Sequence, residues 1–339
     1  MQLRVIEGFS AALIDTPAAK LHEHLGGPTL IHHPATHGGN NKEALFVSVL
    51  LHGNETSGWD GLRQLLRNRP ALPRDLLVFI GNVEAAAAGV RTLPEQPDYN
   101  RIWRDHDGVE GVFAGQLLEY LERCQLAAAL DIHNNTGRNP SYAVLTSLTP
   151  RNRGLAYLLS DKAVYVEEPD TVLSRALEAF CSSIAVEVGP VGDPASDARA
   201  QRLLQEYLAL EELPEDPGPA LQLYRSVARV HVGDGIRFDF ADEFVEGSVL
   251  DDDLILTSGM EAVNFHAIDA GFPFAMTRAP LHTTLRVLDA NHADVTDDFL
   301  EESQGLVSLR QPVIPAMFTT DHAVVRQDCL CYFMIEMSV

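Results

Sequence analysis

The segment Ala44–Glu55, ALFVSVLLHGNE, decides the fold that we predict for this chain. The part from Ala44 to Leu51 is an apolar run, which is typical of a strand buried on both faces of a sheet. The stretch Thr56–Arg69 follows, with apolar side chains at three- and four-residue spacing, and this pattern predicts a helix. A buried strand that leads through a short turn into a helix is the repeating unit of a layered α/β fold.

The same alternation continues along the first two thirds of the chain. Further apolar runs predict buried strands at Leu76–Ile80, Leu126–Ile132 and Ser183–Val188, and helical spacing recurs at Phe113–Arg123, Thr171–Phe180 and Ser196–Leu210. We therefore expect an α/β fold in which a mixed, mainly parallel sheet lies between helices.

The composition of the chain changes after the last of these helices. The stretch Glu212–Ala220 is rich in proline and acidic residues, which ends regular structure. Beyond it, short alternating runs predict strands at Ser226–Val232, Leu254–Thr257 and Leu281–Leu288. We predict two domains, a catalytic domain of residues 1–214 and a smaller, β-rich C-terminal domain of residues 215–339 that caps the pocket.

Charge and composition exclude several classes of partner. The formal net charge of -23 makes a nucleic-acid partner improbable, because phosphate binding needs clustered Lys and Arg. A carboxylate substrate would instead need local positive charge from a metal and from individual arginines. Neither a leader nor a membrane-spanning run is evident, so we expect a cytoplasmic protein without a membrane partner. The cysteines are too few for a disulfide framework and are interpreted as reduced thiols at positions 124, 181, 329 and 331.

Two histidines and a glutamate at the ends of predicted strands indicate a metal site. His52 and Glu55 lie three residues apart in the turn after the first strand, and His133 ends the Leu126–Ile132 run. The motif at His52 is common by chance, and taken alone it is better explained by a helix-capping loop with a surface glutamate, but ligands gather at the carboxyl ends of strands in α/β sheets. Two nitrogens and one oxygen leave a fourth zinc position open, which is a catalytic arrangement. Asp131 would orient a ligand or form a core salt link.

Glu187 is the candidate general base. It lies inside the apolar run Ser183–Val188, where an ionised carboxylate without a partner is costly. Beside a zinc site, such a carboxylate could take a proton from an attacking water and return it to the leaving amine.

Together these motifs resemble the succinylglutamate desuccinylase and aspartoacylase family, relatives of the zinc carboxypeptidases. The resemblance covers about residues 44–200. Its motifs, in the family's order, are His52-Gly-Asn-Glu55, Gly81-Asn82, Arg91, Asn100-Arg101-Ile102-Trp103, Asp131-Ile-His133-Asn-Asn-Thr and Glu187-Val-Gly-Pro.

The resemblance implies a zinc carboxypeptidase-like fold, one Zn²⁺ per chain, and hydrolysis of the amide bond of a small anionic N-acyl amino acid. It implies that Arg91 stabilises the oxyanion, that Asn100 and Arg101 hold a substrate carboxylate, and that Arg175 is a further substrate-binding residue. These roles suit the planar fork of a guanidinium. A surface ion pair is the alternative for each arginine taken alone.

Two features leave the substrate open. The family closes its pocket with a tyrosine and a lysine from the C-terminal domain, whereas the best matching region here, Phe318–Arg326, offers His322 and Arg326. Arg138 is either a pocket cation or a solvated loop charge. The alternatives to a deacylase are a zinc carboxypeptidase acting on peptides and a non-catalytic zinc-binding protein. The chain could also form a homo-oligomer.

The remaining histidines of the N-terminal region, at positions 22, 24, 32, 33 and 37, are irregularly spaced among glycines and prolines. We interpret them as solvated side chains, with a second metal site as the alternative.

Overall fold

The computed structural model describes residues 2–36, 43–105, 108–242 and 252–337, and these form two compact units. The first unit comprises Met1–Asn134 and Ser141–Leu223, and the second comprises Asn135–Pro140 and Tyr224–Ser338. The expected domain boundary after residue 214 stays a prediction. His37 lies outside the described residues.

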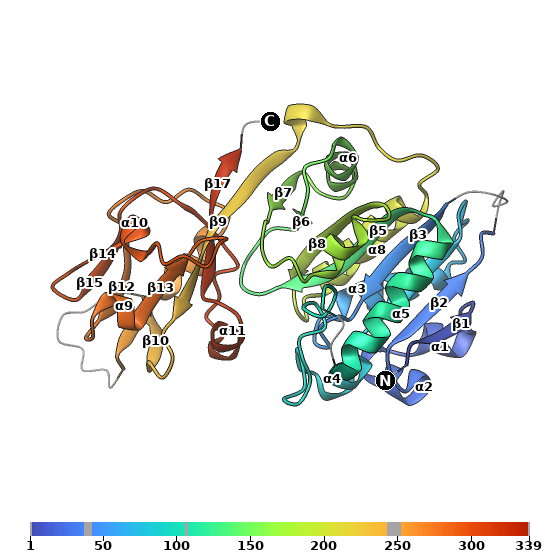
Figure 1. The fold of residues 1–339 in the computed structure, drawn as a ribbon, viewed down its shortest axis with the longest axis horizontal. Helices are drawn as coiled ribbons and strands as arrows, with labels where there is room; N and C mark the ends of the chain where they lie inside the picture. The colour runs from blue at the N-terminus through green and yellow to red at the C-terminus, as the bar shows by residue number, and fades with distance from the viewer. Residues whose placement is uncertain (1, 37–42, 106–107, 243–251, 338–339) are drawn as a thin grey trace. The chain divides into compact units, whose positions relative to one another are not determined.

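A mixed sheet forms the centre of the first unit (Figure 1). Its strand order is β1-β2-β4-β3-β5-β8-β6-β7. β3 is parallel to both β4 and β5, and β6 is parallel to β7, whereas β2 runs antiparallel to β4 and β6 antiparallel to β8. The strands are β1 (Arg4–Glu7), β2 (Thr29–His33), β3 (Ala44–Val49), β4 (Leu76–Ile80), β5 (Leu126–Asn135), β6 (Tyr142–Leu145), β7 (Lys162–Tyr165) and β8 (Ser182–Pro190).

Helices cover both faces of this sheet (Figure 1). On one face, α5 packs Phe113 against Phe79 of β4. On the other face, Gly58 of α3 lies against Val49 and Ile132. The helices are α1 (Ala11–Asp15), α2 (Leu21–Leu25), α3 (Ser57–Arg67), α4 (Val83–Ala88), α5 (Gly108–Cys124), α6 (Pro150–Leu159), α7 (Leu173–Leu177) and α8 (Pro194–Leu208), with a 3₁₀ turn at Ala18–Lys20. α7 is shorter than predicted.

The expected apolar strands are buried as their sequences require. Every residue of β3, β4 and β5 is buried, which is why these strands have continuous rather than alternating apolar runs. The core between the sheet and α5 contains Phe46, Phe79, Trp103 and Phe113, and burial of each such side chain contributes about 1.5–3 kcal/mol. The predicted α/β fold with a mainly parallel sheet between helices is confirmed.

The second unit is β-rich, as predicted. One sheet has the order β10-β11-β12-β15-β14, and another ladder joins β13, β9, β17 and β16. The strands are β9 (Gln222–Val232), β10 (Phe238–Ala241), β11 (Leu254–Thr257), β12 (Pro273–Thr277), β13 (Leu285–Leu288), β14 (Leu300–Ser303), β15 (Leu306–Leu309), β16 (Ile314–Ala316) and β17 (Cys331–Met337). The short helices are α9 (Leu281–Thr284), α10 (Thr296–Phe299) and α11 (His322–Gln327), with a 3₁₀ turn at Ser258–Val263; a further 3₁₀ turn, Gly218–Ala220, lies at the end of the first unit.

The prediction of a strand at Leu281–Leu288 is wrong for the first half of this range. Its first half is the helical turn α9, which Pro280 precedes, and only Leu285–Leu288 pairs as a strand, with β9. Among the described residues, no helix is long and apolar enough to span a membrane. The four cysteines form no disulfide.

Candidate metal centre and active site

The candidate centre begins at the turn between β3 and α3. There a side chain at Gly53 has no room, because a Cβ atom would lie 2.2 Å from the backbone nitrogen of Ala86 and 2.3 Å from the carbonyl carbon of Ala85. The Gly53 N–H also donates to the carbonyl oxygen of Arg91 at 2.9 Å. Glycine at this position therefore lets α4 approach the turn, and the backbone bond brings Arg91 beside His52 and Glu55.

The three predicted metal ligands converge. Oxygen and nitrogen atoms of His52, Glu55 and His133 lie within 4.8 Å of one another, and all three residues are buried. Nδ1 of His52 is 2.8 Å from Oε1 of Glu55, and Nδ1 of His133 is 2.8 Å from Oε2 of the same carboxylate. The two imidazoles thus approach one carboxylate from two sides, with the same ring nitrogen.

Each imidazole uses its other nitrogen to contact a further carboxylate. Nε2 of His133 lies 2.8 Å from Oδ2 of Asp131, and Nε2 of His52 lies 3.0 Å from Oδ1 of Asp98. A carboxylate at Nε2 keeps the proton on that nitrogen, so Nδ1 is left with its lone pair toward the centre of the cluster. Asp131 therefore contacts His133, a candidate metal ligand, which agrees with the interpretation that Asp131 orients a ligand.

Asp98 is a residue of the centre that the sequence interpretation missed. Its only local signal is its position two residues before Asn100, within a motif that had already been singled out. Asp98 also accepts a hydrogen bond from the backbone N–H of Asn100 at 2.7 Å, which fixes the start of that motif beside His52.

The electrostatics of this cluster favour a cation. Burial alone would lower the pKa of His133, but the carboxylates of Asp131 and Glu55 outweigh burial and raise that pKa well above 6.5. Burial alone would raise the pKa of Glu55, but the two imidazoles outweigh it and lower that pKa. Asp98 likewise has a lowered pKa, mainly through His52.

Three carboxylates thus surround two imidazoles inside the protein, and they favour positive charge there. Two nitrogens and one carboxylate oxygen are a donor set that suits Zn²⁺ and other divalent ions of similar preference. The residues present therefore fit the metal that the sequence predicts.

Glu187 lies on β8, opposite Tyr142 in the pairing with β6. Its Oε2 atom is buried and has no hydrogen-bond partner in the described structure. Burial raises the pKa of this carboxyl to about 7, with His133 as the largest opposing influence and Glu55 as a reinforcing one. Glu187 is therefore close enough to respond to the charges of the cluster, and no partner among the described residues is hydrogen-bonded to its Oε2 atom.

Arg91 and Asn100, two of the predicted site residues, both contact the cluster. Nη1 of Arg91 donates to Oε1 of Glu55 at 3.3 Å, and Nη2 donates to Oδ2 of Asp98 at 3.2 Å, so Arg91 is part of the cluster. Nδ2 of Asn100 lies 3.4 Å from Nε2 of His133, and Oδ1 of Asn100 accepts a bond from the Leu173 backbone.

Arg101 follows Asn100 and is half-buried. Its Nη1 donates to the carbonyl oxygen of Asn100 at 2.9 Å. Within the described ranges, no carboxylate forms an ion pair with Arg101, so its guanidinium is available to an anion.

Arg175 lies elsewhere. It contacts Glu178 on the same chain segment at 3.6 Å and donates to the carbonyl oxygen of Glu167 at 3.2 Å. No contact among the described residues links it to the cluster, and its role in substrate binding stays a prediction.

His322 and Arg326, the two residues of the second unit that the sequence offered for the pocket, pack against other residues of that unit. Arg326 covers the ring of Phe238 at 4.7 Å and donates to the carbonyl oxygens of Gly233 and Ile236. The ring of His322 stacks on the same phenylalanine at 4.9 Å. These contacts hold α11 in place. Arg138 is exposed.

Asn134, which follows His133, joins three elements of the centre. Its backbone N–H donates to Oε2 of Glu55 at 3.3 Å. Its side-chain amide donates to Ser57 Oγ at 3.0 Å and to the carbonyl oxygen of Gly189 at 2.9 Å, and its Oδ1 accepts from the Ser57 N–H at 3.2 Å. This asparagine therefore fixes β5 to the start of α3 and to the strand that carries Glu187.

Comparison with known proteins agrees with this geometry. Residues 41–211, half of the chain, match the family described as the succinylglutamate desuccinylase/aspartoacylase catalytic domain. A curated relative from Serratia proteamaculans (strain 568), named succinylglutamate desuccinylase, is 29% identical over 213 residues. That alignment covers 54% of this chain and 64% of the relative, so the chain spans less than two thirds of the length of the relative that it matches.

Solved structures extend the similarity of fold to both units. A succinylglutamate desuccinylase from Vibrio parahaemolyticus superposes with a TM-score of 0.60 at 14% identity and covers 95% of each chain. Murine aminoacylase 3 superposes with a TM-score of 0.55 at 17% identity, covering 88% of this chain and 98% of the mouse protein. At these identities the likeness establishes a shared fold alone.

Proposed function

Since the chain belongs to the succinylglutamate desuccinylase/aspartoacylase family, we propose that it is a zinc-dependent deacylase that hydrolyses the amide bond of an N-acyl amino acid. His52, Glu55 and His133 would hold the metal. The observation that carries the proposal is the carboxylate of Glu187, which has a buried oxygen without a hydrogen-bond partner among the described residues, beside a His–Glu–His cluster. A binding module has no use for such a group, whereas hydrolysis needs a base.

The chemistry divides between the metal and the side chains. When bound, a divalent zinc ion supplies Lewis acidity that polarises the acyl carbonyl and acidifies a water molecule. Glu187 accepts the proton of the attacking water and later delivers it to the nitrogen of the leaving amine. A pKa of about 7 suits both steps, because the carboxyl can take up and release a proton near neutral pH.

Arg91 and Arg101 act on the two negative charges of the reaction. Arg91 is held at the cluster by Glu55 and Asp98, where its guanidinium can stabilise the oxyanion that forms as the carbonyl becomes tetrahedral. Arg101 and Asn100 bind the carboxylate of the amino acid, for which a guanidinium offers two parallel hydrogen bonds. Asp98 and Asp131 keep the imidazoles in the tautomer that a metal requires.

A substrate panel tests this function. The zinc-loaded protein is incubated with N-acetyl, N-succinyl and N-formyl amino acids and with short peptides, and the free amine is measured. We expect release of amine from at least one N-acyl amino acid, and loss of that release in Glu187→Gln. Cleavage of peptides alone would assign a carboxypeptidase, and cleavage of nothing by a fully loaded protein would favour a non-catalytic zinc protein.

The second unit remains a proposed cap that restricts the pocket to small substrates. A cytoplasmic location and a homo-oligomer also remain predictions.

A further inference from the structure

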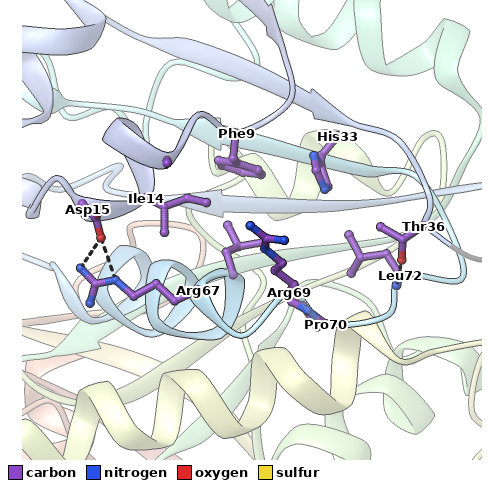
Figure 2. Close-up of a pocket in the computed structure, with 11 residues that line it drawn as sticks. Phe9, Ile14, Asp15, His33, Thr36, Arg67, Arg69, Pro70 and Leu72 are labelled. Carbon is purple, nitrogen blue, oxygen red and sulfur yellow. Dashed lines mark hydrogen bonds and ion pairs between the residues drawn. The ribbon is translucent and has the colours of Figure 1, made fainter.

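A second cavity lies in the first unit, away from the candidate metal centre (Figure 2). Its volume is about 580 Å³, within the range of small-molecule sites. The apolar side chains Phe9, Ile14, Leu66 and Leu72 form much of its lining. They come from the segment around α1, from the end of α3 and from the loop that follows α3, so the cavity is built by several elements of one compact unit.

The register of the sheet places this cavity at the opposite edge from the metal ligands. His33, which lines the cavity, ends β2 and pairs with Leu76, the first residue of β4. His52 and His133 lie at the other, carboxyl ends of the parallel strands β3 and β5. The helix α3 begins two residues after Glu55 and runs about 16 Å, at about 1.5 Å per residue, to the cavity. The cavity is therefore not part of the candidate active site.

One wall of the cavity is aromatic. The rings of Phe9 and His33 lie with their centroids 5.5 Å apart and tilted by 57°. Burial lowers the pKa of His33, so this ring is uncharged at neutral pH. The adjacent His32, which is partly exposed, lies 3.0 Å from a carboxylate oxygen of Asp75. A planar apolar group would find rings and branched aliphatic side chains around it.

Two arginines supply positive charge at this cavity, and they differ in whether an ion-pair partner is present. Arg67 is paired with Asp15 at 3.0 Å. Arg69, by contrast, has no hydrogen bond to its side chain and no ion pair among the described residues. Figure 2 shows the guanidinium of Arg69 turned toward Phe9 and His33, whereas that of Arg67 turns toward Asp15. Arg69 is exposed, and in a protein with a net charge of -23 its guanidinium, which has no ion pair among the described residues, gives the apolar cavity a local positive charge that can pair with an anion.

We propose that this cavity binds a small amphipathic carboxylate, whose aromatic or branched body lies among Phe9, Ile14, Leu66 and Leu72 and whose carboxylate pairs with Arg69. The size of the cavity, its apolar lining and its single uncompensated guanidinium among the described residues agree on this class of ligand. The site is separate from the one that Arg101 serves.

Binding of 3-phenylpropanoate tests the proposal, with 3-phenylpropanamide as its neutral counterpart. Both are titrated into the full-length, zinc-loaded protein and followed by calorimetry. We expect saturable binding of the carboxylate. The amide should bind at least about tenfold more weakly, because a charge-assisted hydrogen bond is lost. Arg69→Gln should weaken carboxylate binding to a similar degree, and Ile14→Trp, which fills the cavity, should abolish it.

Two control variants separate this site from other cations. Arg63→Gln removes the same charge from α3 outside the cavity, where Arg63 pairs with Asp60, and should leave binding unchanged. Arg101→Gln should also leave it unchanged, because it affects the candidate active site only. The proposal is overturned by an absence of saturable binding, by equal affinity for acid and amide, by full affinity in correctly folded Arg69→Gln, or by loss in Arg101→Gln alone.

Discussion

Replacing Glu187 by glutamine should remove activity and, at the same time, change how stability depends on pH. Burial raises the pKa of this carboxyl to about 7 in the folded protein, whereas the ordinary pKa of a solvated glutamate is 4.5. Between these values the folded chain binds a proton that the unfolded chain does not, so the free energy of unfolding falls as the pH rises. Glu187 therefore costs stability above pH 7, and glutamine, which carries no charge, does not.

The size of this effect follows from the two pKa values. A displacement from 4.5 to about 7 corresponds to about 3 kcal/mol of free energy. The glutamine amide would lie where Oε2 has no partner, and a buried unsatisfied group costs about 1–3 kcal/mol at every pH. That cost cancels when two pH values are compared. The free energy of unfolding of Glu187→Gln, measured relative to that of the wild type, should thus rise by about 3 kcal/mol between pH 4.5 and pH 8.

The measurement is urea unfolding of metal-free wild-type and variant proteins at several pH values. The two tryptophans of the chain, Trp59 and Trp103, are both buried in the first unit, so their fluorescence reports its unfolding. In parallel, turnover of the zinc-loaded variant should fall by about 100-fold or more, the usual size of general-base catalysis. A stability difference that is the same at pH 5 and pH 8 would refute the buried charge, and undiminished turnover would remove Glu187 from the chemistry.

The remaining predictions concern the metal, its supporting carboxylates, the substrate and the turn. Purified protein should contain one zinc per chain by metal analysis and lose it in His133→Ala; undiminished metal in that variant would place the site elsewhere. Asp131→Asn should weaken metal affinity by about 10- to 100-fold in a chelator competition, and more than Asp98→Asn, because the Asp131 side chain is 2% exposed and that of Asp98 is 26% exposed. Equal affinities in wild type and Asp131→Asn would contradict this. Arg101→Lys should damage kcat/KM on an N-acyl amino acid nearly as much as Arg101→Ala, with little effect on the matching amide; equal damage on both substrates would indicate a structural role. Gly53→Ala should give an unstable or insoluble protein, since its Cβ would lie 2.2 Å from a backbone nitrogen, and a wild-type unfolding midpoint would show that the turn can move.

Local pattern was sufficient for the elements that carry the centre. The strand β4 has the bounds that its apolar run predicts, and β3 differs only because Leu50 has a positive φ that ends the strand early. Other elements could not be read in this way. β2, β6 and β7 are only four or five residues long, too short for a distinctive pattern, and they form because they pair with neighbours that are distant along the chain.

The sequence by itself determined which residues are the candidates for the chemistry. His52, Glu55, His133 and Glu187 were identified from donor type, spacing and position at buried strands, because these depend on local pattern and on the general direction of parallel strands. It determined in the same way that the centre lies in the α/β part of the chain.

Only the tertiary structure decided which side chains contact one another. It separated Arg91, which joins the cluster, from Arg175, which pairs with Glu178, although both are arginines of the expected kind. It placed Asp98 beside His52, and among the described residues it gave Arg67 an ion-pair partner and Arg69 none. The physical reason is that hydrogen bonds and ion pairs depend on distances of about 3 Å between atoms from distant segments, and sequence spacing does not specify such distances.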